Sequence, residues 1–217
     1  MISAVDASLV YQDHGREVFA CRDIDLTIGP AEFVGILGPS GSGKSSLLYL
    51  LSGLKDPTGG DVLFEKTPYS RMEDTERSSM RLRSFGFVFQ QPFLLGYLTA
   101  LENVVLVGPA TADARDRAIG LLESVGLSDK VHRLPAELSG GEKQRVCVAR
   151  ALFAGPKVVF ADEPTASLDH ASGSAVIRLL SERKRGSLIV VTHDPSMLVS
   201  ADRVLCMEDG RVTGHLP

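Results

Sequence analysis

The distribution of apolar residues along the chain predicts strands of two kinds. Apolar and polar positions alternate over residues 21–28, which is typical of a strand with one face in water. Residues 33–37 form an apolar run, as expected for a strand buried on both faces of a mostly parallel sheet, and similar runs occupy 85–89, 157–161 and 188–191. Near the C-terminus, Asp209 and Gly210 separate two apolar segments and predict a β-hairpin, because this pair readily takes positive φ.

Helical periodicity fills the segments between these strands. Leucines recur on one face of residues 47–54, and apolar residues recur in the same way over 114–125 and 176–180. The last of these helices is expected to end at the cationic run 183–185, because cations in the last turn and Gly186 just after it suit a helix C-terminus. Strands that alternate with helices indicate an α/β fold with a mostly parallel sheet.

The chain is long enough to bury one core, and we interpret its 217 residues as a single domain, 1–217. Residues 94–150 show mainly helical periodicity and are predicted to form a helical subdomain inserted between sheet strands. The remaining segments, about 1–93 and 151–217, then form the core.

Composition and charge narrow the class of protein. Hydrophobic residues make up 44% and charged residues 23% of the chain, the ordinary balance of a soluble globular protein. The net charge of -4 shows no excess of positive charge of the kind that binds nucleic acid, so no nucleic-acid partner is expected. Cys21, Cys147 and Cys206 lack metal-ligand spacing and are interpreted as reduced core thiols of a cytosolic protein.

The sequence does not predict a membrane anchor. Residues 1–6 lack a basic region followed by an apolar run, so no signal peptide is expected. The apolar runs are far shorter than the ~20 residues that a membrane-spanning helix needs. If the protein serves a membrane, we expect another chain to supply the membrane part.

A glycine-rich segment between the strand 33–37 and the helix 47–54 carries the first candidate chemistry. It matches the pattern G-x-x-x-x-G-K-[ST] in the strand–loop–helix context that this pattern requires. Glycines let backbone N–H groups turn toward phosphate oxygens, and the helix N-terminus adds the positive end of a dipole. The plainer alternative is a glycine-rich turn before a helix. The candidate nucleotide-binding residues are Gly38, Pro39, Ser40, Gly41, Ser42, Gly43, Lys44, Ser45 and Ser46.

Two residues of this segment have specific expected roles. Lys44 is expected to reach the β- and γ-phosphates of a nucleotide, and the Ser45 hydroxyl is expected to ligate Mg²⁺. These roles are shared by kinases, GTPases and motor ATPases, so this segment alone leaves the three classes open.

Two adjacent carboxylates follow the apolar run 157–161. Neighbouring strand residues point to opposite sides, so Asp162 and Glu163 can have different roles. Asp162 is expected to hold Mg²⁺ directly or through water, and Glu163 to orient or deprotonate the attacking water as a general base. The alternative is a charged strand end that only meets solvent.

The segment 138–145 reads Leu-Ser-Gly-Gly-Glu-Lys-Gln-Arg. Ser139 and Glu142 have the S-x-x-E spacing of a capping box, and a helix-compatible run follows. Gly140 and Gly141 leave the backbone amides at this helix start open to an anion. Without further context, the segment could be merely a well-capped helix.

This segment resembles the signature motif of the ABC ATPase family, and other features follow in the order of that family. Gln90 resembles the Q-loop glutamine, and the Ser-Leu-Asp segment that ends at Asp169 resembles the D-loop. His193 resembles the switch histidine, and Tyr11 stands where the family often places an aromatic ring against adenine. Alone, Tyr11 would fit a half-buried strand aromatic and His193 a structural histidine.

The resemblance covers essentially the whole chain. It implies a P-loop NTPase fold, an α/β fold with an N-terminal antiparallel β region, and it implies ATP and Mg²⁺ as cofactors. The implied catalytic residues are Lys44, Gln90, Glu163 and His193. The implied nucleotide contacts beyond the glycine-rich segment are Tyr11, Ser139, Gly140, Gly141, Glu142 and Asp169. The implied metal ligands are Ser45, Gln90 and Asp162.

The resemblance also implies partners. Two copies, as a homodimer, would enclose two ATP molecules head to tail, with the glycine-rich segment of one copy and residues 139–141 of the other around each γ-phosphate. The pair would drive a separate integral membrane permease from the cytoplasmic face of the membrane, as a peripheral subunit. The loop 90–93 is expected to report the nucleotide state to that permease.

Segments 87–95 and 98–104 resemble one bacterial subgroup, although Gly96 stands where its members often have proline. The subgroup includes lipoprotein-release, macrolide-export, haem-export, antimicrobial-peptide-resistance and cell-division ATPases, and it implies an exporter or a mechanical stroke in the permease. Little sequence follows the predicted hairpin, so no C-terminal regulatory domain is expected.

Two other functions stay open from the sequence. The first is an ABC ATPase that acts on nucleic acid or ribosomes, although long coiled coils, zinc cysteines and a second fused ATPase domain are not visible. The second is a nucleotide-gated scaffold with low turnover, against which Glu163 and His193 argue. The sequence does not indicate a cargo or a direction of transport.

Overall fold

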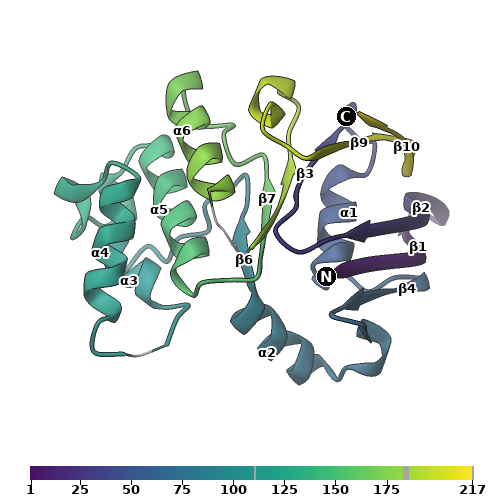
Figure 1. Ribbon diagram of the computed structural model, residues 1–217, viewed down its shortest axis with the longest axis horizontal. Coiled ribbons are helices and arrows are strands. Elements are labelled where there is room, and N and C mark those ends of the chain that lie inside the picture. The colour runs from purple at the N-terminus through teal and green to yellow at the C-terminus, as the bar shows by residue number, and fades with distance from the viewer. Residues whose placement is uncertain (110, 183–185, 217) are drawn as a thin grey trace.

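The computed structural model describes residues 1–109, 111–182 and 186–216, and it contains two β-sheets (Figure 1). The larger sheet has six strands in the order β10-β9-β3-β8-β7-β6. They are β3 (Phe33–Leu37), β6 (Phe85–Val88), β7 (Val158–Asp162), β8 (Ser187–Val191), β9 (Arg203–Glu208) and β10 (Arg211–Leu216). Neighbouring strands are parallel except for β9 and β10, so the predicted mostly parallel core sheet is confirmed.

The central strands of this sheet are buried on both faces, as their apolar sequences predict. In β7, Val158 and Phe160 pack into one core, while Ala161 packs into the core on the opposite face. The predicted C-terminal hairpin joins β9 to β10. Its turn residues Asp209 and Gly210 have φ angles of 48° and 77°, the positive values that such a turn requires.

The second sheet is antiparallel and has the strand order β2-β1-β4-β5. Its strands are β1 (Ile2–Asp13), β2 (Arg16–Ile28), β4 (Gly59–Phe64) and β5 (Thr67–Pro68). The strand predicted over 21–28 is the second half of β2, whereas the sequence patterns did not single out β1 and β4. This sheet confirms the N-terminal antiparallel β region.

Helix α1 (Lys44–Leu51) lies between the two sheets (Figure 1). Its leucines pack into the core that both sheets share. The predicted leucine stripe extends three residues too far, to Leu54, because the helix ends at Leu51. Gly53 has a φ of 66° and the N–H of Leu54 donates to the carbonyl of Tyr49 at 2.9 Å, which closes the helix and leaves Leu54 39% exposed.

Helices α3 (Ala100–Val105), α4 (Ala114–Ser124), α5 (Gly140–Phe153) and α6 (His170–Ser181) lie on the other face of the larger sheet. Helix α2 (Asp74–Ser84) instead packs with Met80 into the core that contains α1. Helix α5 contacts strand β6 and helices α3, α4 and α6, so it is the centre of the helical region (Figure 1). Short 3-10 helices lie at Tyr69–Arg71, Ser128–Lys130, Pro135–Glu137 and Pro195–Leu198. The helices predicted over 114–125 and 176–180 are α4 and α6, and the cationic run 183–185 lies outside the described residues.

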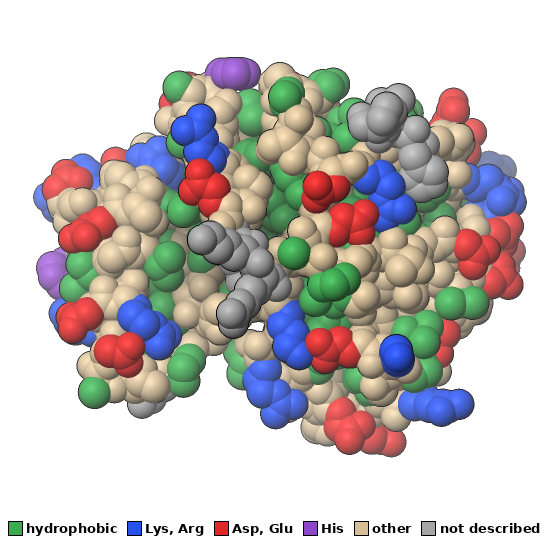
Figure 2. Space-filling model, viewed as in Figure 1, with side chains coloured by type: hydrophobic (Ala, Val, Ile, Leu, Met, Phe, Trp, Pro, Cys, Tyr) green, Lys and Arg blue, Asp and Glu red, His purple; other side chains and the backbone are tan. Residues whose placement is uncertain are grey.

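Charged side chains of both signs are interspersed on the face of the molecule shown in Figure 2, over the helices and over both sheets. In the parts of the chain that the structure describes, no helix is both long enough and apolar enough to cross a membrane.

Candidate functional site

The glycine-rich segment forms the loop that joins β3 to α1. Gly43 has a φ of 99°, and a Cβ atom on it would lie 2.0 Å from the carbonyl oxygen of Ala20. A Cβ atom on Gly38 would lie 2.3 Å from the carbonyl oxygen of Met207. Only glycine therefore fits at these two positions, where the loop passes close to the backbones of β2 and β9.

Lys44 is the first residue of α1, and its side chain folds back over this loop. The Nζ atom donates hydrogen bonds to the carbonyl oxygens of Gly38 at 2.9 Å and Pro39 at 2.7 Å. The ammonium group thus lies beside backbone N–H groups at a helix N-terminus, an arrangement that favours an anion.

Asp162, the last residue of β7, is buried and accepts two hydroxyl hydrogen bonds from α1. Ser45 Oγ donates to Oδ1 at 3.0 Å, and the Tyr49 hydroxyl donates to Oδ2 at 3.1 Å. Burial raises the pKa of Asp162 above its ordinary value, although the two hydrogen bonds oppose this shift. Burial and the Asp162 carboxylate raise the pKa of Tyr49 to about 12, so its hydroxyl keeps the proton that it donates.

Glu163 lies just beyond β7 in a left-handed conformation with a φ of 47°. The side-chain alternation that predicts opposite sides for Asp162 and Glu163 does not apply, because the strand ends at Asp162. The backbone N–H of Glu163 donates to the carbonyl of Val191 at 2.9 Å, and its Oε2 lies 2.9 Å from Nδ1 of His193. The Glu163 side chain is 15% exposed and the His193 side chain 75% exposed.

Most of these residues line one open cavity of about 530 Å³, whereas the predicted site residues Pro39, Ser42 and Asp162 are not among its lining residues. The predicted site residues that line it are Tyr11, Gly38, Ser40, Gly41, Gly43, Lys44, Ser45, Ser46, Gln90, Glu163 and His193. They come from β1, from the loop before α1, from the first turn of α1 and from the ends of β6, β7 and β8. The parallel strands of the core sheet therefore bring together side chains that are far apart in the sequence.

The predicted signature segment lies elsewhere, since Ser139, Glu142 and Asp169 are not among the residues that line this cavity. Ser139 begins α5 with the predicted capping box: its Oγ accepts from the N–H of Glu142 at 3.2 Å, and its own N–H donates to Glu142 Oε2 at 2.7 Å. Asp169 caps α6 by accepting from the N–H of Ser172 at 3.0 Å. Within one copy of the chain, these residues do not reach the cavity.

The sequence pattern of the family described as ABC transporter matches residues 21–166. The chain belongs to the ABC transporter family. It is the ATP-binding, ATP-hydrolysing component, as the fold and the family together show. The predicted P-loop NTPase fold is confirmed by the same comparisons.

Relatives and solved structures resemble the ABC ATPase over nearly its whole length. The "Lipoprotein-releasing system ATP-binding protein LolD" of Legionella pneumophila is 43% identical over 207 residues, 92% of this chain and 91% of the relative. The protein of the same description from Psychrobacter arcticus is 40% identical over 97% of this chain and 96% of its own length.

Two solved structures, both dimeric, are of the bacterial ABC transporter cassette MJ0796, one of them in a post-hydrolysis state with ADP and Pi. Each is 35% identical, has a TM-score of 0.94 and covers 100% of this chain and 98% of the solved chain.

Among the residues of the ABC ATPase cavity that sequence reasoning missed are Val18 and Phe19 of β2. Val18 pairs with Tyr11 across the β1–β2 ladder, and the Arg22 guanidinium lies 4.1 Å from the centre of the Phe19 ring. The strand predicted over 21–28 begins too late to include them. Only the register of β1 with β2 places them beside Tyr11.

A second missed feature joins the signature helix of the ABC ATPase to the loop after β6. Gln144 Nε2 donates to the carbonyl of Phe89 at 3.0 Å, and the Cys147 thiol to that of Pro92 at 2.6 Å. Arg150 donates to the carbonyls of Pro92 and Phe93, both at 2.9 Å. One face of α5 thus holds the loop that carries Gln90. Burial raises the pKa of Cys147 to about 11, so its thiol stays protonated and can donate.

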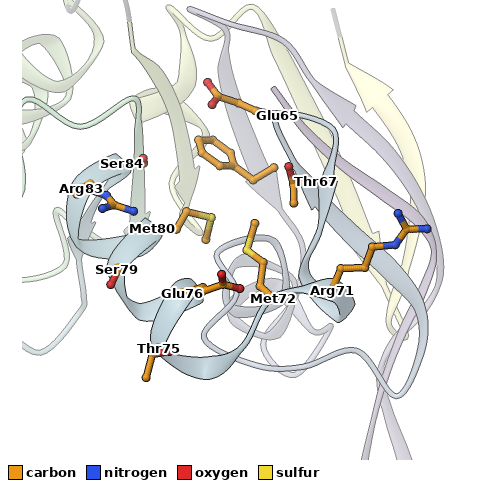
Figure 3. A pocket seen from close by; sticks show the side chains of 11 residues that line it. Glu65, Thr67, Arg71, Met72, Thr75, Glu76, Ser79, Met80, Arg83 and Ser84 are labelled. Carbon is orange, nitrogen blue, oxygen red and sulfur yellow. The ribbon is translucent and has the colours of Figure 1, made fainter.

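A larger cavity of about 750 Å³ lies between α2 and the strands β4 and β5 (Figure 3). Figure 3 shows the side chains of Met72 and Met80 pointing into it, with Glu65 and Thr67 on the strand side. None of the residues that line it is a predicted site residue of the ABC ATPase. The candidate nucleotide site is therefore not in the larger of these two cavities.

Proposed function

We propose that this ABC ATPase is the motor subunit of a lipoprotein-releasing system, working as a homodimer on a membrane permease. One observation carries the ATPase part of the proposal: Tyr11, Lys44, Ser45, Gln90 and Glu163 line one cavity although they come from four separate segments. The relatives named as lipoprotein-releasing subunits, at 43% and 40% identity over nearly the whole chain, support the transport part.

The glycine-rich loop and Lys44 hold the phosphates of ATP. Backbone N–H groups of the loop bind phosphate oxygens, and the Lys44 ammonium exchanges its hydrogen bonds with the carbonyls of Gly38 and Pro39 for charge-assisted bonds to phosphate. Tyr11, which is 36% exposed at the cavity wall, provides an aromatic surface for the adenine ring.

The oxygen donors beside the loop fit Mg²⁺. Ser45 Oγ lies 3.0 Å from a buried Asp162 carboxylate oxygen, and Mg²⁺ prefers hard oxygen ligands of this kind. Burial raises the pKa of Asp162, so a nearby cation would stabilise the ionised carboxylate. Ser45, Asp162 and the Gln90 side chain are the residues that would hold the ion. When bound, Mg²⁺ neutralises negative charge on the phosphates.

Glu163 acts as the general base, and His193 positions it. A base must lie within hydrogen-bonding reach of the water that it activates, and Glu163 lines the cavity while its Oε2 already contacts His193 at 2.9 Å. The exposed His193 ring can exchange this contact for one to the γ-phosphate. Glu163 would then be released to face the attacking water.

The second copy completes the site. Ser139 and Gly140 are exposed at the N-terminus of the fourteen-residue helix α5, where backbone N–H groups favour an anion, yet they lie outside their own cavity. In a head-to-tail dimer, residues 139–142 of one copy cover the phosphates bound to the other, with Asp169 beside them. The dimeric form of the two similar solved structures supports this assembly.

The permease contacts the region beside the Gln90 loop, at the cytoplasmic face of the membrane. A cavity of about 270 Å³ there is lined by apolar residues that include Leu82, Phe87 and Val107. The neighbouring Phe93 and Tyr97 are 65% and 77% exposed. An apolar segment of the permease would cover these side chains. The hydrogen bonds between α5 and the Gln90 loop would then transmit a movement of the loop to Ser139, at the start of α5.

The test is purification of the tagged chain from its host membranes in mild detergent, followed by reconstitution with a triacylated lipoprotein. We expect integral membrane subunits to copurify, and ATP to release the lipoprotein from the vesicles with the parent chain but not with Glu163→Gln. Recovery of an active ATPase with no membrane subunit would contradict the transport part. Release that does not need ATP would contradict the motor role.

A further inference from the structure

The phenol of Tyr49 contacts the same carboxylate as Ser45. We propose that Tyr49 is a positioning residue for the Mg²⁺ site, one that fixes the Asp162 carboxylate and thereby orients the Ser45 hydroxyl. This inference rests on the proposed function, because it requires that Ser45 and Asp162 hold Mg²⁺.

The spacing along α1 makes the double contact possible. Ser45 and Tyr49 are four residues apart, so both side chains lie on the same face of the helix, toward the end of β7. Ser45 Oγ is 3.0 Å from Oδ1 of Asp162, and the Tyr49 hydroxyl is 3.1 Å from Oδ2. Each oxygen of the carboxylate therefore has its own hydroxyl donor, and rotation of the carboxylate would break both hydrogen bonds.

This arrangement determines how Ser45 presents its oxygen. A hydroxyl has one proton and two lone pairs, and the Ser45 proton is directed to Oδ1 of Asp162. The lone pairs then point away from Asp162 and are available to a cation. If Tyr49 did not hold Oδ2, the carboxylate could turn and the Ser45 proton would no longer have a fixed direction.

Aromatic packing keeps Tyr49 in place and connects it with the Gln90 loop. The Tyr49 ring meets Phe89 edge to face at 6.3 Å between centroids. Phe89 stacks on Phe87 at 5.6 Å, and Phe87 stacks on Phe160 at 5.6 Å. Phe89 directly precedes Gln90, and Phe160 lies two residues before Asp162 on β7. Tyr49 thus packs against the segments that carry the other candidate ligands.

Tyr49→Phe tests the role, because it removes only the hydroxyl and keeps the ring. Binding of a fluorescent ATP analogue is measured in excess chelator and then in a Mg²⁺ titration. We expect unchanged binding in chelator and about a tenfold higher Mg²⁺ concentration at half-saturation, since a hydrogen bond to a charged group is lost. Tyr69→Phe is the matched control, because the Tyr69 hydroxyl donates to the carbonyl of Leu51 on the same helix, at 3.0 Å, and does not touch Asp162.

The outcomes separate the inference from the proposed function. Tyr49→Phe could reach half-saturation at the same Mg²⁺ concentration as the parent and Tyr69→Phe, with only its thermal midpoint lowered. That result would show that Tyr49 has a structural role alone. A parent chain that binds the analogue with no dependence on Mg²⁺ would overturn the Mg²⁺ site itself, and the role of Tyr49 with it. Circular dichroism of each variant establishes that it is folded.

Discussion

The Oε2 atom of Glu163 lies 2.9 Å from Nδ1 of His193, across the ends of the neighbouring parallel strands β7 and β8. Glu163 has a φ of 47°, which is unfavourable for a residue with a side chain, and its backbone N–H donates to Val191 on the other strand. The local backbone is therefore built to bring the two side chains together. In this arrangement, the proposed base is engaged by the residue that we expect to contact the γ-phosphate.

Glu163→Gln should abolish turnover while it preserves nucleotide binding. Glutamine keeps the size of the side chain but cannot accept a proton, and general-base catalysis typically contributes about 10²–10⁴-fold. We expect ATP hydrolysis to fall at least about 100-fold and the Kd for ATP to stay within about threefold of the parent. Glu65→Gln, at an exposed carboxylate paired with Lys157, is the control. A Glu163→Gln variant that hydrolyses ATP at the parental rate would refute the assignment.

Ser139→Ala and Thr99→Ala should separate capping from catalysis. Both residues begin a helix with the same capping box, Ser139 with Glu142 and Thr99 with Glu102. Loss of either hydroxyl should reduce the free energy of unfolding by about 1 kcal/mol, measured by urea denaturation. Only Ser139→Ala should also lower the ATPase rate, because only Ser139 is proposed to contact ATP. Equal ATPase rates in the two variants would leave Ser139 with a structural role alone.

The capping carboxylates should make the fold sensitive to acid. The pKa of Glu142 lies below its usual value because the backbone N–H of Ser139 donates to it, and the N–H of Thr99 lowers the pKa of Glu102 in the same way. A glutamate whose pKa is lower in the folded than in the unfolded state stabilises the fold fully at a pH above its unfolded pKa of about 4.5. This stabilisation is lost as the pH falls through its pKa in the folded state.

Urea denaturation should therefore give a midpoint that is constant near neutral pH and falls below about pH 4.5. Glu142→Gln should lose less stability over the same interval, because its side chain does not titrate. A midpoint that does not change down to about pH 3.5 would show that these caps do not govern acid stability.

Asp162→Asn should stabilise the fold without nucleotide and remove the response to Mg²⁺. Burial raises the pKa of Asp162, so the ionised carboxylate is disfavoured in the folded state at neutral pH, and a neutral amide of similar size removes that cost. We expect a higher thermal midpoint than the parent in chelator, and an increase on addition of ATP that is no larger with Mg²⁺ than in chelator. A lower midpoint in chelator would mean that the hydroxyls of Ser45 and Tyr49 more than offset the burial of the charge.

Local sequence patterns were sufficient to predict the central strands and the first phosphate-binding loop. The strand 33–37 agrees with β3 at both ends, because an apolar run before a glycine-rich loop has few other ways to fold. The predicted end of α1 is wrong, because Leu54 continues the leucine periodicity whereas the turn at Gly53 ends the helix before it. Helix α2 has few apolar residues, so hydrophobic periodicity did not reveal it.

The candidate site could be predicted where its residues follow strands, and not where it depends on pairing or packing. Asp162 and His193 follow apolar runs, and the carboxyl ends of parallel strands meet at one edge of a sheet. Phe19 enters the cavity through the register of β1 with β2, and the contact of Tyr49 with Asp162 depends on how α1 packs against β7. No local pattern encodes either relationship.

The central claim, that each ATP site is shared between two copies of the chain, is tested most directly by mixing two inactive variants. Lys44→Ala removes the phosphate contact of the loop, and Ser139→Arg blocks the signature segment; each should be inactive alone but folded, as checked by thermal unfolding. In an equimolar mixture, half of the randomly paired dimers are mixed, and each mixed dimer has one intact site formed by Lys44 of one copy and Ser139 of the other. We therefore expect the mixture to regain about a quarter of the parental ATPase rate. A mixture as inactive as the separate variants would contradict the shared site.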